Sequence, residues 1–344
     1  MDLPSSRPVH LHARATDLKR AHRRQFLHLA AGAAALPLAP HVALAQAAWP
    51  ARPVRVVVGF AAGGPNDILA RLLGQWLSER LGQPFIIENK PGASGNIATE
   101  LVARSAPDGY TLQTVSPTNA INATLFERLN FDFARDITPV ATIFRGPFVV
   151  TINPTVPART VPEFLAYAKA NPGKINYASV GNGSPAHLSC ELLKMMTGID
   201  MVHVPYRGGA PAITDAIAGQ VQLYFVPTVA AIEYIRGGQL RALAVTTLER
   251  AEAFPDLPSI GEFVPGFQAS IWFGIGAPRN TPADIVGLLN KEINAGLMNP
   301  KIKEQLVALG GTALTGSPAE FRQLIADETA KWAKVIKFAG IKPV

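Results

Sequence analysis

The sequence predicts an α/β protein with two lobes, each built around a mainly parallel sheet flanked by helices. Short β-branched runs alternate with helical patterns through most of the chain, as in strand–helix units of a parallel sheet. The 344 residues exceed what one hydrophobic core usually organises, so two lobes are expected. Apolar residues make up 48% and charged residues 17%, which is typical of a well-packed globular chain.

Residues 1–45 have the pattern of a cleaved export signal. A basic segment with a pair of arginines precedes an apolar run over 26–39, and a small-residue cleavage site follows at 43–45. The string RRQFL has the twin-arginine form, but its neighbours depart from the usual motif, so twin-arginine and Sec export both remain open. An uncleaved amphipathic anchor is the alternative. We expect cleavage before Gln46 and a mature protein in the bacterial periplasm.

The net charge of +7 comes mostly from this leader. Without residues 1–45, 26 basic and 23 acidic residues remain, a net charge of +3. The mature chain shows no basic stripe with interleaved aromatic residues, so we expect no nucleic-acid partner. The single cysteine, Cys190, lies in an apolar helical pattern, which favours a buried thiol over a reactive one.

Local patterns predict the first strands and helices. A nearly continuous apolar run over Val54–Phe60 predicts a buried strand. Apolar residues on one face then predict a helix over 68–81, which Gly82 ends as a C-terminal cap. Two further strands are expected at Phe85–Glu88 and Thr111–Ser116.

Three later helices have recognisable starts. Thr160, Thr281 and Ser317 each stand three positions before a carboxylate, with a proline in the first turn. Each hydroxyl is therefore predicted to cap a helix. The last of these helices is expected to run to about Phe338.

Two extended segments predict strands that cross between the lobes. They cover Thr138–Ile152 and Phe267–Ala277. Two crossings make the first lobe discontinuous, formed by 46–146 plus 273–344. The second lobe is then 147–272.

Two glycine loops, at Gly59–Asp67 and Ala178–His187, each join a predicted strand to a helix start. Small residues let a ligand approach the backbone, and the free N–H groups of a helix start favour an anion. Ligands of such folds bind beyond the carboxyl ends of the strands, so two such loops point to an anion in one cleft. We expect Gly63 and Gly64 to tolerate no side chain. A plain tight turn with Asp67 as a helix-dipole partner is the alternative.

Two more loops carry groups suited to the wall of a cleft. Ser116–Asn119 follows one strand, and Val204–Pro211 follows another. Tyr206 could pack on a ligand, and the backbone of 207–209 could donate to it. Whether Arg207 is solvated or faces the ligand stays open.

Catalytic and metal-binding motifs are missing from the sequence. There is no H-E-x-x-H, C-x-x-C, G-x-S-x-G or S-x-x-K string. After the leader only His187 and His203 remain. We therefore expect no enzymatic activity, no cofactor and no metal.

Six strings, taken in order, resemble the Bug-type substrate-binding receptors of tripartite tricarboxylate transporters. They are VRVVVGFAAGGPND, PFIIENKPGASGN, APDGYTL, NYASVGNGSPAHL, VHVPYRGGAPAITDAIAGQVQL and QLRALAVT. The resemblance extends from Trp49 to the tail KWAKVIKFAGIK. It implies the two-lobed periplasmic-binding-protein (Venus flytrap) fold, with the ligand in the interlobe cleft. The implied ligand is a small carboxylate: a di- or tricarboxylate, an acidic amino acid or an aromatic acid.

The resemblance also implies how the ligand is held and delivered. The carboxylate would be bound by backbone amides, ordered water and hydroxyls rather than by an arginine. A monomeric receptor would then pass it, in a transient contact, to integral-membrane permease subunits. The ligand-binding residues that the resemblance implies are Phe60, Ala62, Gly63, Asp67, Ser116, Thr118, Asn119, Asn182, Gly183, Ser184, His187, Tyr206 and Gly208. We add Gly64 because it lies in the first glycine loop.

One position departs from the family pattern. Receptors of this kind commonly carry an aspartate where this chain has Val226, followed by Pro227 and Thr228. Its absence disfavours a ligand with an amino group and favours one that carries hydroxyl, carboxyl or apolar groups. A periplasmic sensor that reports to a signalling partner remains the alternative function, because it would use the same fold.

Overall fold

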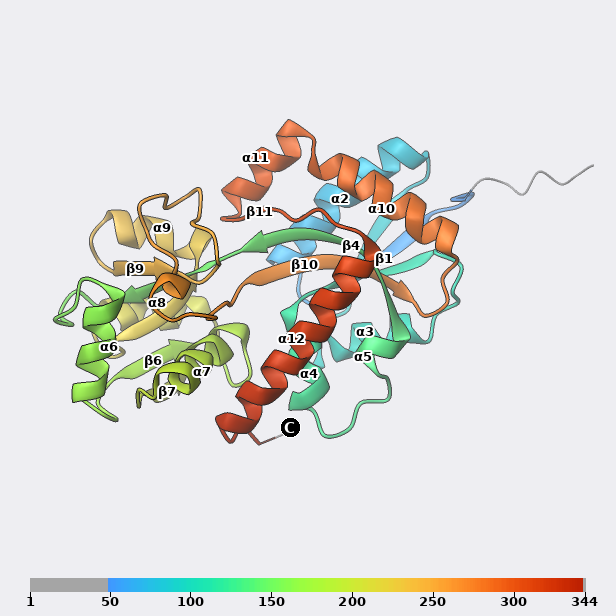
Figure 1. The fold of residues 1–344 in the computed structure, drawn as a ribbon. Helices are drawn as coiled ribbons and strands as arrows, with labels where there is room; N and C mark the ends of the chain where they lie inside the picture. The colour runs from blue at the N-terminus through green and yellow to red at the C-terminus, as the bar shows by residue number, and fades with distance from the viewer. Residues whose placement is uncertain (1–48, 343–344) are drawn as a thin grey trace, which may run out of the picture. The chain divides into compact units, whose positions relative to one another are not determined.

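The computed structural model describes residues 49–342, and the predicted export signal lies outside them. Two separate sheets, each with its own flanking helices, carry the fold (Figure 1). Within the described residues, no helix combines the length and apolar character needed to cross a membrane. The α/β class with two sheets is as predicted.

The first sheet has six strands in the order β11-β4-β10-β3-β1-β2. They are β1 (Val54–Val58), β2 (Phe85–Asn89), β3 (Thr111–Val115), β4 (Ile137–Gly146), β10 (Ile271–Pro278) and β11 (Thr312–Ala313). Its helical segments are α2 (Pro65–Leu81), η1 (Ala93–Gly95), α3 (Asn96–Ala103), α4 (Pro117–Leu125), α5 (Phe133–Asp136), α10 (Ala283–Leu297), α11 (Pro300–Ala308) and α12 (Pro318–Phe338).

Both faces of the first sheet are buried, as the continuous apolar run of β1 predicts. Val56 belongs to the same buried cluster as Leu73 of α2. Val57, which points to the opposite face, belongs to the cluster of Val102 in α3 and Phe321 in α12. The sheet therefore lies between two layers of helices.

The second sheet has five strands in the order β7-β6-β8-β5-β9. They are β5 (Phe148–Ile152), β6 (Asn176–Ser179), β7 (Val202–Pro205), β8 (Leu223–Pro227) and β9 (Arg241–Val245). Its helical segments are α6 (Val161–Ala170), α7 (Pro185–Thr197), α8 (Gly209–Ile217), α9 (Thr228–Arg236) and η2 (Ile260–Glu262).

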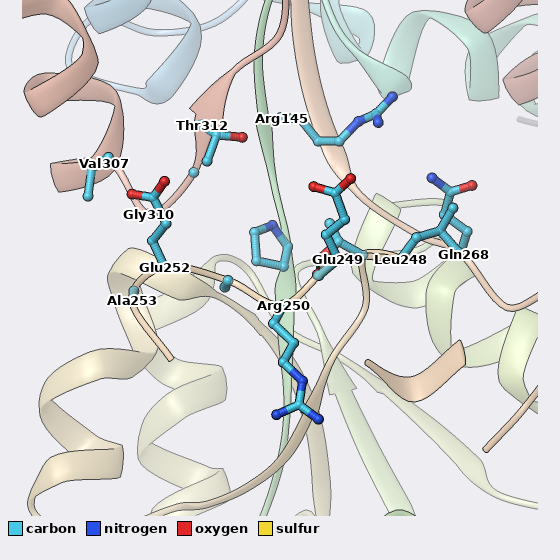
Figure 2. A pocket seen from close by; sticks show the side chains of 14 residues that line it. Arg145, Leu248, Glu249, Arg250, Glu252, Ala253, Gln268, Val307, Gly310 and Thr312 are labelled. Atoms are coloured by element: carbon cyan, nitrogen blue, oxygen red, sulfur yellow. Dashed lines mark hydrogen bonds between the residues drawn. The ribbon is translucent and has the colours of Figure 1, made fainter. Parts of the chain in front are cut away.

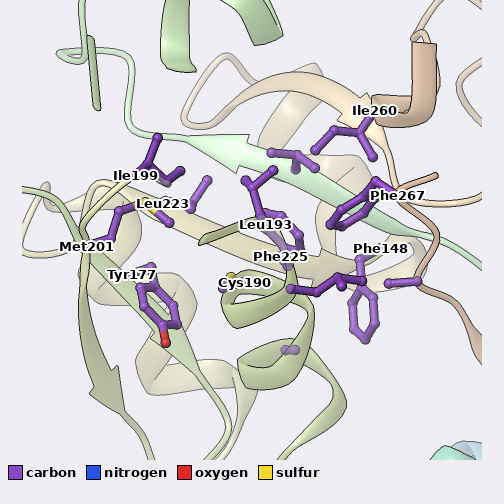
Figure 3. Packing of buried hydrophobic residues seen from close by; sticks show 14 of the residues in the cluster. Phe148, Tyr177, Cys190, Leu193, Ile199, Met201, Leu223, Phe225, Ile260 and Phe267 are labelled. Carbon is purple, nitrogen blue, oxygen red and sulfur yellow. The ribbon is translucent and has the colours of Figure 1, made fainter. Parts of the chain in front are cut away.

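Cys190 lies in the core of the second sheet, as its apolar pattern predicts. Figure 3 shows it among Tyr177, Leu193, Phe225 and other buried side chains. Its side chain is fully buried, and burial raises the pKa of the thiol well above its usual value. The thiol is therefore a packing residue.

Two connections link the sheets, through β4 into β5 and from β9 to β10. Strand β10 runs antiparallel to β4 and to β3, whereas β2, β1 and β3 run parallel. A chain that leaves the first sheet along β4 must return in the opposite direction, which explains the antiparallel pair. The second sheet is mixed in the same way, with β5 antiparallel to β8 and β9 and the remaining pairs parallel.

The hydrophobic core of the second sheet includes residues from helices of the first. Leu125 of α4 and Trp332 and Val335 of α12 belong to the same buried cluster as Phe148 and Phe225. Helix α12 also contributes Phe321 to the core of the first sheet. This one helix therefore packs in both cores.

Two of the three predicted helix caps are present. The Thr160 hydroxyl accepts a hydrogen bond from Glu163 N, and Ser317 forms a reciprocal capping box with Glu320 at the start of α12. The prediction for Thr281 is wrong, because α10 begins at Ala283 with Pro282 in the capping position. The Thr281 hydroxyl instead donates to the Pro278 carbonyl, 2.8 Å away, and so closes the preceding turn.

Candidate functional site

The first glycine loop connects β1 to α2 and presents free backbone donors. The N–H groups of Ala61, Ala62 and Gly64 have no acceptor within the described residues, and they lie just before the α2 N-terminus. Gly63 has a φ of 83°, a conformation that favours glycine. Gly64 has a φ of −80°, and an added Cβ would lie 3.6 Å from Ala61 O. The backbone conformation therefore favours glycine at Gly63 and does not require it at Gly64, while obstruction of a ligand by a side chain at either position stays a prediction.

Asp67 stabilises the first glycine loop through hydrogen bonds to its buried carboxylate. Its side chain is only 3% exposed, and it accepts hydrogen bonds from Gly63 N (2.9 Å), from Arg71 (2.9 Å) and from Asn89 Nδ2 (3.0 Å). The Arg71 guanidinium, with help from Gly63 N–H and Asn89, lowers the pKa of Asp67 to about 2, although burial opposes this shift. The carboxylate is therefore ionised, neutralised and fully occupied. In this structure it fixes the loop through these hydrogen bonds, and a direct contact between Asp67 and a ligand stays a prediction.

The segment 92–96 contacts the first glycine loop and was not predicted as part of the site. Ala93 and Ser94 have φ values of 45° and 52°, which non-glycine residues rarely adopt and which often occur at functional sites. Asn122 Nδ2 donates to Ser94 O (2.9 Å) and to Asn96 Oδ1 (2.8 Å). A Cβ added to Gly95 would lie 3.5 Å from the Phe60 ring, so the two loops are in close contact.

The loop at Ser116–Asn119 joins the same network. Thr99 Oγ1 accepts from Gln113 Nε2 (2.7 Å) and from Asn119 Nδ2 (3.0 Å), and it donates to Gly95 O (3.1 Å). Asn119 Oδ1 accepts from Ser116 N at 2.9 Å. Ser116 and Asn119 are both buried, whereas Thr118 is partly exposed. Of the three predicted side chains, only that of Thr118 is partly exposed here.

The second glycine loop uses most of its own backbone donors. Gly181 N donates to Ser179 Oγ (3.1 Å), Ser184 N to Gly181 O (3.2 Å) and Gly183 N to His187 Nδ1 (3.0 Å). The Ser184 hydroxyl caps α7 by accepting from His187 N. The Gly183 N–H is therefore not free for an anion, whereas the Asn182 side chain is exposed.

His187 is buried, with 4% of its surface exposed. Its ring lies over the α7 N-terminus, where Nδ1 accepts the Gly183 N–H. In this structure His187 therefore supports the loop from inside, and its contact with a ligand stays a prediction.

The loop that follows β7 is hydrogen-bonded to the second glycine loop. Tyr206 N donates to Ser179 O (2.9 Å), and the Tyr206 hydroxyl donates to Asp215 Oδ2 (2.7 Å). Burial and this carboxylate raise the pKa of Tyr206 to about 12. Gly208 precedes α8 with a φ of 121°, and Arg207 is exposed. Strands β6 and β7 run parallel, so their two loops leave the same edge of the sheet.

Val226, where the family pattern has aspartate, is fully buried in the second sheet. It pairs with Val149 of β5 and shares a buried cluster with Tyr224 and Ala178. An apolar residue is what this packing requires.

The second glycine loop also contacts a helix of the first sheet. Gly183 has a φ of 70°, and an added Cβ would lie 3.1 Å from Leu125 Cδ1 and closer still to Cδ2. Leu125 is the last residue of α4, which the Ser116–Asn119 loop begins. The second glycine loop therefore packs against α4, which belongs to the predicted first lobe.

A pocket lies beside the crossing strands (Figure 2). Its lining includes Arg145 of β4, Pro147 of the β4–β5 connection, and Glu249, Arg250 and Glu252 from the segment after β9. None of the predicted site residues lines it. The two carboxylates offset the two guanidinium groups, so this pocket has no excess positive charge for a carboxylate ligand, whereas the first glycine loop presents free N–H donors.

Comparisons with known proteins give consistent matches. The model of the tripartite tricarboxylate transporter family receptor matches residues 69–341. Protein BugT of Bordetella pertussis is 37% identical over 297 residues, which are 86% of this chain and 91% of that protein. R. palustris Rpa4515, solved with adipate, is 39% identical with a TM-score of 0.73, covering 86% of this chain and 100% of that one. MatC (Rpa3494) from Rhodopseudomonas palustris, solved with bound malate, is 35% identical with a TM-score of 0.69, covering 84% of this chain and 100% of that one. These matches span both sheets.

Proposed function

Because the chain belongs to the tripartite tricarboxylate transporter receptor family, we propose that it captures a small carboxylate in the periplasm and delivers it to the membrane subunits of such a transporter. Members of this family are solute-binding receptors and not enzymes. They are periplasmic binding proteins. Delivery to particular permease subunits, the twin-arginine or Sec route and a monomeric state belong to the proposal.

The observation that carries the proposal is the donor set of the first glycine loop. Three backbone N–H groups, from Ala61, Ala62 and Gly64, are free at the start of a 17-residue helix. The N-terminus of such a helix carries a partial positive charge, so it favours a negatively charged ligand. The nearest cation on α2, Arg71, is already paired with Asp67. The loop therefore offers neutral donors to a carboxylate.

We place the ligand between two lobes. The first lobe is formed by 46–146 plus 273–344, and the second by 147–272. The side chains and backbone groups with room to contact it are Phe60, Ala62, Gly63, Gly64, Thr118, Asn182, Ser184, Tyr206 and Gly208. Four of the residues expected to bind it instead hold these groups in place: Asp67, Ser116, Asn119 and His187. Gly183 forms the left-handed turn of the second glycine loop.

For the ligand we propose an aliphatic dicarboxylate. The two solved relatives described above carry adipate and malate, each with two carboxylates on a short chain. Two carboxylates suit a site with donors on two lobes, because each end of the ligand can be held by one lobe. Tricarboxylates, acidic amino acids and aromatic acids are the alternatives that the test separates.

Native mass spectrometry of the purified protein, followed by calorimetry with a carboxylate panel, tests this function. We expect adipate or malate to bind and the neutral diamide of adipic acid, which has nearly the same shape, to bind at least a hundredfold more weakly. Equal affinity for the acid and the diamide would contradict the anion site. Binding of citrate, glutamate or benzoate in place of both dicarboxylates would change the ligand class.

A further inference from the structure

Two histidines lie face to face beneath the second glycine loop. The ring centroids of His187, on α7, and His203, on β7, are 3.7 Å apart with 8° between the ring planes. Tyr177 of β6 stacks on His203 with centroids 5.0 Å apart. Tyr177 and His203 are register partners in the parallel β6–β7 pair, so the sheet itself sets this arrangement.

Each imidazole holds one end of the loop through a ring nitrogen. His187 Nδ1 accepts the Gly183 N–H at 3.0 Å, so this nitrogen must carry a lone pair and no proton. His203 Nε2 lies 2.6 Å from Ser179 Oγ, which in turn donates to Gly181 O and accepts from Gly181 N. The two rings therefore fix both Ser179 and Gly183, between which Asn182 is presented.

The charges around the pair disfavour a protonated ring. Lys194 of α7 acts on both histidines, and its ammonium pairs with Glu191, which also accepts from the Tyr177 hydroxyl. Cys190, the remaining titratable neighbour on α7, is a buried neutral thiol. Two imidazolium rings at this separation would repel each other, and each would lose hydration.

The direction of the pKa shifts agrees with this geometry. Burial is the main cause, and it lowers the pKa of His187 to about 3, with His203 and Lys194 adding to the effect. Burial and Lys194 likewise lower the pKa of His203 to about 4. Both rings are therefore neutral near pH 7. They become charged only in acid, where the Gly183 N–H would meet a second N–H instead of a lone pair.

We propose that His187 and His203 are positioning residues of the ligand site, and that they hold the second glycine loop in its binding form only while the His187 ring is neutral. Protonation removes the acceptor of Gly183, whose left-handed turn places the loop against Leu125. The loop then loses its fixed geometry and the receptor loses affinity. The effect on affinity rests on the proposed function, whereas the effect on the loop does not.

Hydrogen exchange measured by mass spectrometry on the full mature chain tests the effect on the loop. The probe is the peptide that covers 179–187, with each rate corrected for the intrinsic pH dependence of exchange. We expect its protection to fall at least tenfold between about pH 7.5 and about pH 4, with little change in the first glycine loop. Unchanged protection of this peptide in acid would overturn the inference.

Two conservative variants separate titration from packing. His187→Asn places an amide oxygen near the position of Nδ1, and His203→Gln places an amide near Nε2, and neither can be protonated in this range. We expect His187→Asn to keep its protection within about twofold across the same pH range. His203→Gln removes the stacked ring and keeps His187, so it should still lose protection in acid. A loss in His187→Asn equal to that of the wild type would overturn the inference, and if His187→Asn does not fold, the wild-type exchange experiment decides it.

Calorimetry with adipate and malate then measures the effect on affinity. The ligands titrate as well, so the relevant quantity is the affinity of the wild type divided by that of His187→Asn at each pH. We expect this ratio to fall at least fivefold from about pH 7.5 to about pH 4. A constant ratio would show that the histidines do not act on the site. Failure of both ligands to bind at about pH 7.5 would contradict the proposed ligand class, while the exchange experiment still decides the effect on the loop.

Discussion

Alanine at Gly183 tests the contact between the second glycine loop and α4. Gly183 and Gly63 have similar φ values, 70° and 83°, so alanine at either position meets the left-handed backbone penalty of about 1–2 kcal/mol. An added Cβ at Gly63 has no atom within 4 Å, whereas at Gly183 it is 3.3 Å from Leu125 Cγ and closer to both methyl carbons. Overpacking of this kind costs about 1–3 kcal/mol more.

Urea denaturation therefore should show three different losses in the free energy of unfolding. We expect about 2–5 kcal/mol for Gly183→Ala, about 1–2 for Gly63→Ala and less than about 0.5 for Gly64→Ala, which has an ordinary φ. In a Leu125→Ala background the additional loss at Gly183 should disappear, because the clashing methyl groups are gone. Equal losses for Gly183→Ala and Gly63→Ala would refute the packing of this loop against α4.

Three more changes test the elements around the site. Asp67→Asn should lower the free energy of unfolding by about 1–3 kcal/mol, since Arg71 and Gly63 lose a charged acceptor. The pKa of Asp67 falls from 3.8 to about 2 on folding, so its stabilisation is complete above pH 3.8 and is lost as the pH falls to about 2; acid titrations of the variant should lack this loss. Arg207→Ala should weaken adipate binding by less than about tenfold in calorimetry, because this side chain is exposed, and a much larger loss would mean that an arginine holds the carboxylate. Glu328→Gln should destabilise the fold by about 1–3 kcal/mol and alter the near-UV dichroism of tryptophan, because the carboxylate accepts from both Trp272 Nε1 and Trp332 Nε1; an unchanged spectrum would contradict this role.

The parts of the fold that depend on neighbouring residues were predictable from the sequence. The cap at Ser317, the left-handed glycine that ends α2 and the strand–glycine–helix order of both loops each follow from a few adjacent residues. The error at Thr281 has the same local origin. The Thr281 hydroxyl donates to the Pro278 carbonyl of the preceding turn, and the adjacent residues do not reveal that this turn competes with the helix start for the hydroxyl.

The support of the site could not be predicted, because it joins residues far apart in the chain. Asn89 contacts Asp67 only because β1 and β2 are neighbours, and Thr99 contacts Asn119 only because α3 and α4 cover the same face. The string NKPGASGN was visible as a motif, but nothing local indicated the strained turn at Ala93 and Ser94.

The histidine stack likewise depends on strand register. His203 faces His187 because it is paired with Tyr177 across β6 and β7, and a shift of one residue would turn it to the other side of the sheet. Among the side chains that the resemblance assigns to the ligand, Asp67 and His187 are buried and hydrogen-bonded within the loops, whereas Asn182 is exposed. Neither burial nor these hydrogen bonds are visible in a single sequence.

The position of α12 has a consequence for the order of folding. The core of the second sheet, whose strands end at Val245, includes Trp332, Val335 and Ile336 from the last helix of the chain. A chain made from its N-terminus has therefore finished all strands of that sheet long before the helix that completes their core exists. The second sheet cannot reach its native packing as an independent unit, and both halves of the molecule become complete only when the final turns of α12 are in place.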